Sequence, residues 1–105
     1  MPHTPPEPPE CRTMDEVRQG VDALDAQLVD LLAQRFGYMR AAARIKPERG
    51  QVRDEKRKAE VIAKVRARAE TLGLPGDLLA ELWDRLVEGS IAYEFEHWDD
   101  ARRKG

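Results

Sequence analysis

The sequence lacks three features that would place the protein outside the cell or in a membrane. Cys11 is its only cysteine, so no disulfide can form within the chain, and we expect a free surface thiol without a catalytic role. No apolar run approaches the ~20 residues that a membrane-spanning helix needs. The N-terminus has no basic start followed by an apolar core, which a secretion signal would require. We therefore expect a cytoplasmic protein.

An excess of positive charge is also lacking. Lys and Arg number 18 and Asp and Glu number 20, which gives a formal net charge of -2. A surface that binds nucleic acid or anionic lipid needs clustered positive charge, so we expect neither nucleic acid nor a membrane as a partner. Helix formers are abundant and β-branched residues are few, which favours an all-α fold, and 105 residues fit one domain.

Proline marks the start of the first predicted helix and its end. Prolines crowd residues 1–12, where they exclude helix and predict a disordered tail. The next proline is Pro47, so the proline-free stretch Thr13–Lys46 predicts one long helix. Thr13 and Glu16 form a capping-box pattern at its start.

Two shorter helices complete a domain that we expect to span residues 13–105. The second should run from about Arg53 to Leu72 and stop at Gly73, because glycine readily ends a helix. The third should begin near Pro75 and reach Trp98 or beyond, before a charged C-terminal tail. Short connections of this kind are typical of helix bundles.

The long helix carries an apolar stripe that repeats every three to four residues. At about 1.5 Å per residue this helix would be roughly 50 Å long, whereas a compact chain of this size has a radius of gyration of only about 13 Å. One subunit cannot cover such a helix, so we expect an intertwined homodimer in which two copies bury each other's long helices. The stripe consists of Val17, Val21, Leu24, Leu28, Leu31, Arg35, Tyr38, Ala42 and Ile45.

The arginine in this stripe is the first pointer to function. Burying a charge without a partner is costly, so a packed Arg35 needs an anion. Lys46 follows eleven residues later and faces nearly the same way, about 16 Å along the helix, so both side chains could reach one ligand. Arg18 points elsewhere, roughly 25 Å from Arg35. In an antiparallel dimer, Arg18 of the partner subunit could instead share the site.

A simpler interpretation exists for each of these charges. Arg18 and Lys46 could be surface cations whose stems cover apolar side chains, and the charged run 53–58 is usual at a solvated helix start. In the third helix, Ser90 and Glu94 are four residues apart and share a face that borders the apolar positions. An acid there is either at the rim of the core or buried.

Taken in order, these residues resemble the all-helical chorismate mutase family of small intertwined dimers. The stretch VRQGVDALDAQLVDLLAQRFGYMRAAARIK (17–46) is similar to the first helix of that family. VRDEKR (52–57) is similar to the start of its second helix, and LVEGSIAYE (86–94) to part of its third.

The resemblance implies a binding site for a small dicarboxylate that is shared between two subunits. Arg18 of the partner subunit and Arg35 would hold the two carboxylates of the substrate. Arg57 would add a further cation to the binding shell, and Ser90 would contact a carboxylate. Asp54 would lie near the substrate hydroxyl.

The resemblance also implies three catalytic groups for the rearrangement of chorismate to prephenate, which are Arg35, Lys46 and Glu94. Lys46 would donate to the ether oxygen of the breaking bond, and Glu94 stands where the family has a Gln or Glu that does the same. The reaction is intramolecular and needs orientation and charge stabilisation but no nucleophile, metal or cofactor. Glu94 can donate only when protonated, so we expect better turnover in mildly acidic buffer. Lys58 stands where many relatives have a glutamate.

Two other functions fit parts of the sequence. The isochorismate pyruvate lyase branch has the same fold and pocket and would give salicylate and pyruvate; GYMRAAARIK (37–46) and the late Trp98 resemble it. We favour the mutase because Asp54 and Ser90 look more like that branch. An amino analogue of chorismate is a further possible substrate. A helical dimerisation module without chemistry would use the same charges for interhelical ion pairs.

Overall fold

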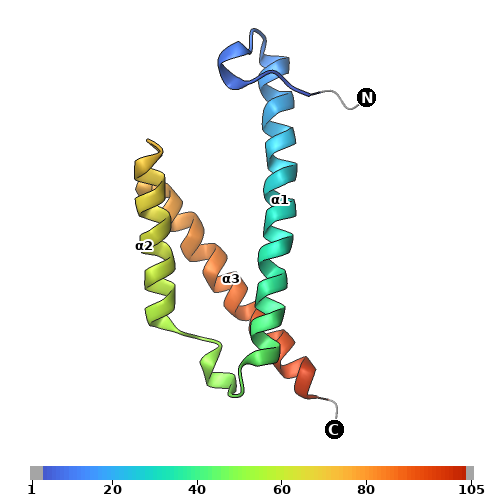
Figure 1. The fold of residues 1–105 in the computed structure, drawn as a ribbon, viewed down its shortest axis with the longest axis vertical. Helices are drawn as coiled ribbons and strands as arrows, with labels where there is room; N and C mark the ends of the chain where they lie inside the picture. The colour runs from blue at the N-terminus through green and yellow to red at the C-terminus, as the bar shows by residue number, and fades with distance from the viewer. Residues whose placement is uncertain (1–3, 104–105) are drawn as a thin grey trace. The chain divides into compact units, whose positions relative to one another are not determined.

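The computed structural model describes residues 4–103, and within them it contains three α-helices, two short 3-10 helices and no strand (Figure 1). This confirms the predicted all-α fold with one long and two shorter helices. Along the chain the elements are η1 (Pro8–Glu10), α1 (Met14–Ile45), η2 (Arg49–Gln51), α2 (Glu55–Thr71) and α3 (Gly76–Arg102).

The capping box at the start of α1 is formed as predicted. The Thr13 hydroxyl accepts from the Glu16 amide at 3.1 Å, and the Glu16 carboxylate accepts from the Thr13 amide at 3.2 Å. Each residue thus satisfies an amide of the other that has no partner inside the helix. The helix ends at Ile45, one residue short of the predicted end, because Pro47 restricts the backbone of Lys46.

Local chemistry also explains the boundaries of α2 and the start of α3. Asp54 precedes α2, and its carboxylate accepts from the Arg57 amide at 3.0 Å, which caps the first turn. After α2, Gly73 has φ 73°, a left-handed conformation that glycine adopts at little cost. Pro75 is then the last residue before α3.

Two expectations about the chain ends were wrong in part. Helix continues to Arg102, through a segment that we expected to be a charged tail. Near the N-terminus we had excluded helix, yet Pro8–Glu10 forms one 3-10 turn. Prolines are tolerated there because the first residues of a helix need no amide donor. The disorder of residues 1–12 stays a prediction, and residues 1–3 lie outside the described residues.

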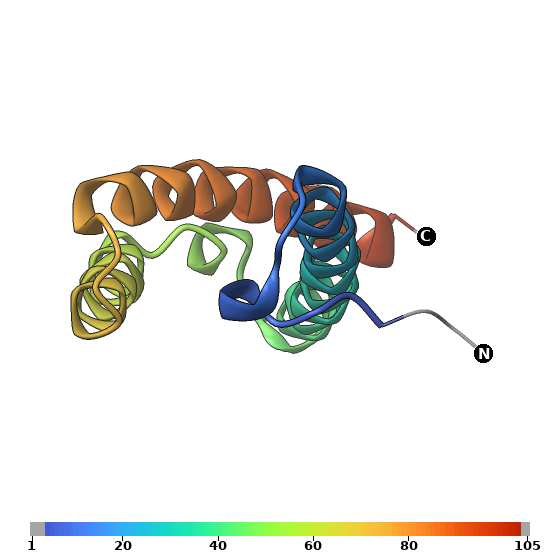
Figure 2. The ribbon, with the colours of Figure 1, turned by 90° about the horizontal axis from the view of Figure 1, so that it is seen from above.

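The chain divides into two compact units, Met1–Phe36 and Gly37–Gly105. In the second unit, α3 returns from the turn after α2 and packs against it (Figures 1 and 2). The apolar core of this unit lies between these helices and the segment that precedes α2. Its buried members are Val52, Val87 and Ile91, with Val61, Trp83, Phe95 and Trp98 packed around them.

The first unit leaves the apolar stripe of α1 uncovered by its own residues. Leu24, Leu28 and Leu31 are 56%, 54% and 57% exposed. Contiguous apolar surface on a helix usually marks a contact with another chain. These leucines of the stripe therefore remain exposed to solvent in one chain, as the sequence predicted. The intertwined homodimer that would bury them stays a prediction. None of the helices formed by residues 4–103 is both long and apolar enough to cross a membrane.

Candidate active site

Lys46 and Glu94, two of the three predicted catalytic residues, meet in the second unit. Lys46 is the first residue after α1, and Glu94 lies in the second half of α3. The Lys46 Nζ is 2.7 Å from the Glu94 Oε2, and only 5% of the Glu94 side chain is exposed. Glu94 is therefore a buried acid and not a residue at the rim of the core.

The contact between these two groups is an ion pair without good hydrogen-bond geometry. The Glu94 Oε2 has no hydrogen-bond partner among the described residues, although the ammonium lies close to it. The Lys46 side chain remains 29% exposed, so its ammonium is reachable from solvent. A half-buried cation and a buried carboxylate with an unused acceptor direction are suited to bind a polar atom between them.

An open pocket lies beside Lys46, which lines it together with a third predicted residue, Asp54, whereas Glu94 is not among the lining residues. Its volume of about 530 Å³ is within the range of small-molecule sites, about 300–1,000 Å³. Cations and carboxylates are mixed along its wall, as in a site that binds both anionic and hydroxyl groups. The lining residues are Ile45, Lys46, Pro47, Gln51, Arg53, Asp54 and Glu55.

The charged residues at the start of α2 also cap the helix and form ion pairs on its surface. The carboxylate of Asp54 caps the helix, as described above, and Arg57 is 60% exposed with its nearest partner, Glu60, at 3.8 Å. These features fit the interpretation of a solvated helix start. Asp54 nevertheless lines the pocket, whereas Arg57 is not among the lining residues.

Lys58, for which the sequence offered no role, joins α2 to α3. Its ammonium is 2.8 Å from Glu88 and 3.0 Å from Asp84, and Arg53 donates to both oxygens of Glu88 at 2.8 and 3.1 Å. The hydrogen bonds from Arg53, and then from Lys58, lower the pKa of Glu88 to about 2. Glu88, followed by Asp84, raises the pKa of Lys58 in turn.

Ser90 lies one turn before Glu94 on the same helix and is buried. Its hydroxyl donates to the Leu86 carbonyl at 2.7 Å, a bond within α3 that is common for a serine in a helix. Its predicted role in binding a carboxylate stays a prediction.

Arg18 and Arg35 belong to the first unit. The Arg18 side chain is 69% exposed, and Asp15, one turn away, is 3.7 Å from its guanidinium. Arg35 is half-buried on α1. The exposure of Arg18 is compatible with a solvated surface residue. It is equally compatible with a side chain that would enter the active site of a second chain. The convergence of these arginines with Lys46 stays a prediction.

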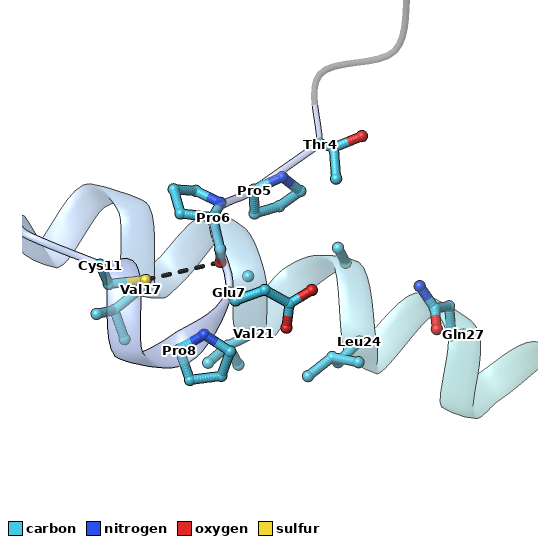
Figure 3. Close-up of a pocket in the computed structure, with 12 residues that line it drawn as sticks. Thr4, Pro5, Pro6, Glu7, Pro8, Cys11, Val17, Val21, Leu24 and Gln27 are labelled. Atoms are coloured by element: carbon cyan, nitrogen blue, oxygen red, sulfur yellow. Dashed lines mark hydrogen bonds between the residues drawn. The ribbon is translucent and has the colours of Figure 1, made fainter.

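A second cavity, of about 330 Å³, lies in the first unit between the N-terminal segment and α1 (Figure 3). Pro5, Pro6 and Pro8 face the apolar side chains of Val17 and Val21 across it. Cys11 is half-buried here and donates to the Pro6 carbonyl at 3.8 Å. Its lining contains none of the predicted site residues, so within the described part of the chain the site is better sought beside Lys46.

Sequence reasoning missed two residues that contact Lys46. The Trp98 indole and the Arg102 guanidinium both donate to the Lys46 carbonyl, at 3.0 and 2.8 Å. No signal in the sequence could identify these contacts, because the acceptor is a backbone atom more than fifty residues away. We had noted Trp98 only as a late tryptophan and had assigned Arg102 to the tail.

Comparisons with known proteins show the family of the chain. Residues 17–95 match the model of the family chorismate mutase type II, and the chain belongs to that family. The resemblance found in the sequence is thereby confirmed. Family membership supports an enzyme of the isomerase or lyase type that acts on a small molecule.

Two relatives show how the chain relates to other members. It is 25% identical over 95 residues to an isochorismate pyruvate lyase of Pseudomonas aeruginosa, a match that covers 90% of this chain and 94% of that protein. It is 32% identical over 79 residues to the T-protein of Enterobacter agglomerans, which covers 74% of this chain but 21% of that protein. The matched region is thus nearly a whole protein in one relative and a minor part of the other.

Proposed function

We propose that the protein is a chorismate mutase that rearranges chorismate to prephenate. The observation that carries this proposal is the half-buried Lys46 ammonium, 2.7 Å from the buried Glu94, at an open pocket that Lys46 and Asp54 line. The rearrangement breaks a carbon–oxygen bond of an ether, and negative charge grows on that oxygen. A fixed ammonium in a partly dry site stabilises such charge more strongly than water does.

The remaining predicted residues would bind and orient the substrate. Chorismate is a dianion, and its enolpyruvyl arm must fold over the ring before the bond can form. Arg35 and the partner subunit's Arg18 would hold its two carboxylates, because a guanidinium matches a carboxylate with two donors. Arg57 and Ser90 would complete the binding shell. No nucleophile, metal or cofactor is required for this chemistry.

A second copy of the chain would complete the site. More than half of the surface of Leu24, Leu28 and Leu31 is exposed on the helix that carries both arginines. An intertwined dimer would bury this surface and bring the partner subunit's Arg18 to the pocket beside Lys46. With its mixed surface charge the protein would act in the cytoplasm, on a small molecule and without nucleic acid.

Glu94 has a defined place in this proposal. When no substrate is bound, its carboxylate neutralises the Lys46 ammonium. When chorismate is bound, a protonated Glu94 would donate to the same ether oxygen as Lys46, whereas an ionised Glu94 would repel the growing charge. Turnover should therefore be better in mildly acidic buffer than at neutral pH.

The test is direct conversion of substrate by the purified protein. Chorismate is incubated with the wild-type chain and with Lys46→Ala, and prephenate is measured. We expect prephenate from the wild type and a loss of about 100-fold or more in kcat for the variant, since removal of one stabilising donor costs roughly 100- to 1,000-fold. A wild-type protein that is folded and dimeric but leaves chorismate unchanged would contradict the proposal.

Isochorismate pyruvate lyase is the second candidate, favoured by the relative of that name, 94% of which the match covers. The same incubation with isochorismate, followed by detection of salicylate and pyruvate, separates the two functions. An amino analogue of chorismate can be tested in parallel. If the folded protein converts none of these compounds, the non-catalytic dimerisation module becomes the better interpretation.

A further inference from the structure

The C-terminal end of α1 has backbone carbonyls that the helix itself cannot satisfy. The last four carbonyls of any α-helix lack an amide partner within it. Here Lys46 donates its amide to the Ala42 carbonyl at 2.9 Å, but the carbonyls of Ala43 and of Lys46 itself need donors from elsewhere. Both donors come from α3. The last turns of α3 lie beside this end of α1 (Figures 1 and 2).

Arg102 and Trp98 supply these donors. The Arg102 guanidinium donates to the Ala43 carbonyl at 3.0 Å and to the Lys46 carbonyl at 2.8 Å. The Trp98 indole donates to the Lys46 carbonyl at 3.0 Å. The carbonyl of Lys46 therefore accepts two hydrogen bonds, and a cation lies at the negative end of the α1 dipole.

The guanidinium of Arg102 is itself held in place. It stacks over the Trp98 ring at 4.1 Å from the ring centre, and it also donates to the Trp98 carbonyl at 3.3 Å. The side chain of a stacked arginine is already ordered, so each additional hydrogen bond costs it little conformational entropy. The pair therefore acts as one rigid support under the backbone of Lys46.

A second contact fixes the chain just after Lys46. Arg49 donates to both carboxylate oxygens of Asp99 at 2.8 and 3.2 Å, and its guanidinium lies 4.5 Å from the centre of the Phe95 ring. The hydrogen bond from Arg49 lowers the pKa of Asp99, so this pair stays ionised over the neutral range. The loop on both sides of Pro47 is thus anchored to α3.

The spacing of these groups on α3 shows how they act together. Glu94, Trp98 and Arg102 are four residues apart and lie on one face of the helix. All three contact Lys46: Glu94 at the ammonium, and Trp98 and Arg102 at the main chain. One face of α3 therefore holds both ends of this residue.

We propose that Trp98 and Arg102 are positioning residues that fix Lys46 for the reaction. The inference rests on the proposed function, since Lys46 matters only if its ammonium acts on a substrate. A misplacement of about 1 Å in a catalytic group can lower the rate by as much as 100-fold. Lys46 extends from a helix end, where backbone order is otherwise lowest, so the support from α3 decides where its ammonium lies.

Steady-state kinetics test the proposal in a set of variants. Arg102→Ala should lower kcat about tenfold and leave KM within about twofold, because Lys46 acts on charge that develops during the reaction. Arg102→Lys keeps the charge but cannot donate to two carbonyls in the same way, so it should restore only part of the loss. Trp98→Phe keeps the ring and removes one donor, and should cost about threefold.

Arg103→Ala is the matched control. Arg103 is the neighbouring residue, 75% exposed, and pairs with Asp100 at 3.3 Å. It removes the same charge from the same region without touching Lys46, so kcat should not change. If Arg103→Ala lowers kcat as much as Arg102→Ala, or if Arg102→Ala leaves kcat unchanged, the proposal is overturned.

Backbone order at Lys46 gives a readout that does not depend on activity. In the NMR relaxation of the dimeric protein, the Lys46 amide should have an order parameter of about 0.85, and Arg102→Ala should lower it to about 0.6 while core amides stay unchanged. An unchanged Lys46 amide overturns the positioning role even if kcat falls. A wild type that converts neither chorismate nor isochorismate removes the proposed function instead, so the two failures are distinguishable.

Discussion

The two compact units of the chain differ in how they cover their apolar side chains. In Gly37–Gly105, Val52, Val87 and Ile91 are buried, and ion pairs join α2 and the loop before it to α3. In Met1–Phe36, the leucines of α1 remain more than half exposed. The second unit thus has a small buried core of its own, although Ile45, Leu78 and Leu82 remain 72%, 48% and 52% exposed, whereas the leucines of the first unit have no such core. Of the predicted site residues, Lys46, Glu94, Asp54, Arg57 and Ser90 lie in the second unit, whereas Arg18 and Arg35 lie in the first.

The largest effect is expected from a charged substitution in the exposed apolar stripe of the first unit. Leu28→Glu places a charge in the predicted dimer interface, which cannot bury an unpaired carboxylate. We expect the molar mass in analytical ultracentrifugation to fall by about half and activity to be lost. Gln19→Glu adds the same charge on the opposite face of α1 and should change neither. A fully active monomer of Leu28→Glu would rule out a shared site.

Removing the arginine of the stripe should have the next largest effect. Arg35→Ala should remain folded by circular dichroism and dimeric, but lose about 1,000-fold in kcat/KM, because a bidentate contact to a substrate carboxylate disappears. Gln34→Ala, at the preceding exposed position, is the control and should stay active. Full activity of Arg35→Ala, or a gain in stability without any catalysis to lose, would favour the dimerisation module.

A smaller effect is expected from the buried acid of the second unit. Turnover should be better in mildly acidic buffer than at neutral pH, because Glu94 can donate to the ether oxygen only when it is protonated. Glu94→Gln supplies a donor at every pH and should flatten the profile. The measurement is kcat from pH 5 to pH 8 for both proteins. A wild-type profile that is flat over this range would count against the predicted role of Glu94.

The smallest effect concerns the ion pairs that join α2 and the loop before it to α3 in the second unit. The pKa of Glu88 is lowered from 4.5 to about 2, so its contribution to stability is present above about pH 5 and is lost as the pH falls through 2. Glu88→Gln should therefore lower the Tm by a few degrees at pH 7 and leave it unchanged near pH 2, since exposed pairs contribute little.

Thermal melts at the two pH values measure this difference, with Glu81→Gln as the control. Glu81 is an exposed residue of α3 for which residues 4–103 offer no ion pair, so its replacement should not alter the Tm at either pH. A Tm difference for Glu88→Gln that is equal at pH 2 and pH 7 would show that the effect is not electrostatic.

The sequence predicted those features of the fold that depend on neighbouring residues. The capping box of Thr13 and Glu16, the stop before Pro47 and the left-handed Gly73 each involve contacts within a few positions, and all are found. The third helix reaches beyond Trp98 as predicted, but part of the expected charged tail is helical, and there Asp99 contacts Arg49 and Arg102 contacts the Lys46 carbonyl. These partners are distant in sequence and leave no periodic signal.

For the candidate site, too, the sequence indicated which residues to consider but not which contacts they make. Spacing alone left the burial of Glu94 open, because an acid beside an apolar stripe can lie on either side of the core boundary. The partners of Lys58 depend on how α2 packs on α3, which a charge run cannot reveal. The roles of Arg18, Arg35 and Asp54 came from the family resemblance, whereas the meeting of Lys46 with Glu94 came from the fold.

The ion pair between Lys46 and Glu94 also affects how the enzyme would meet the other solutes of a cell. A half-buried ammonium without a counterion would attract any small anion of the cell, such as phosphate or chloride. Here the positive charge is already matched by an internal counterion, so a stray anion gains little by entering. Chorismate would bring two carboxylates for the arginines and an ether oxygen for the Lys46 ammonium. These contacts together would offset the free energy lost when Lys46 separates from Glu94.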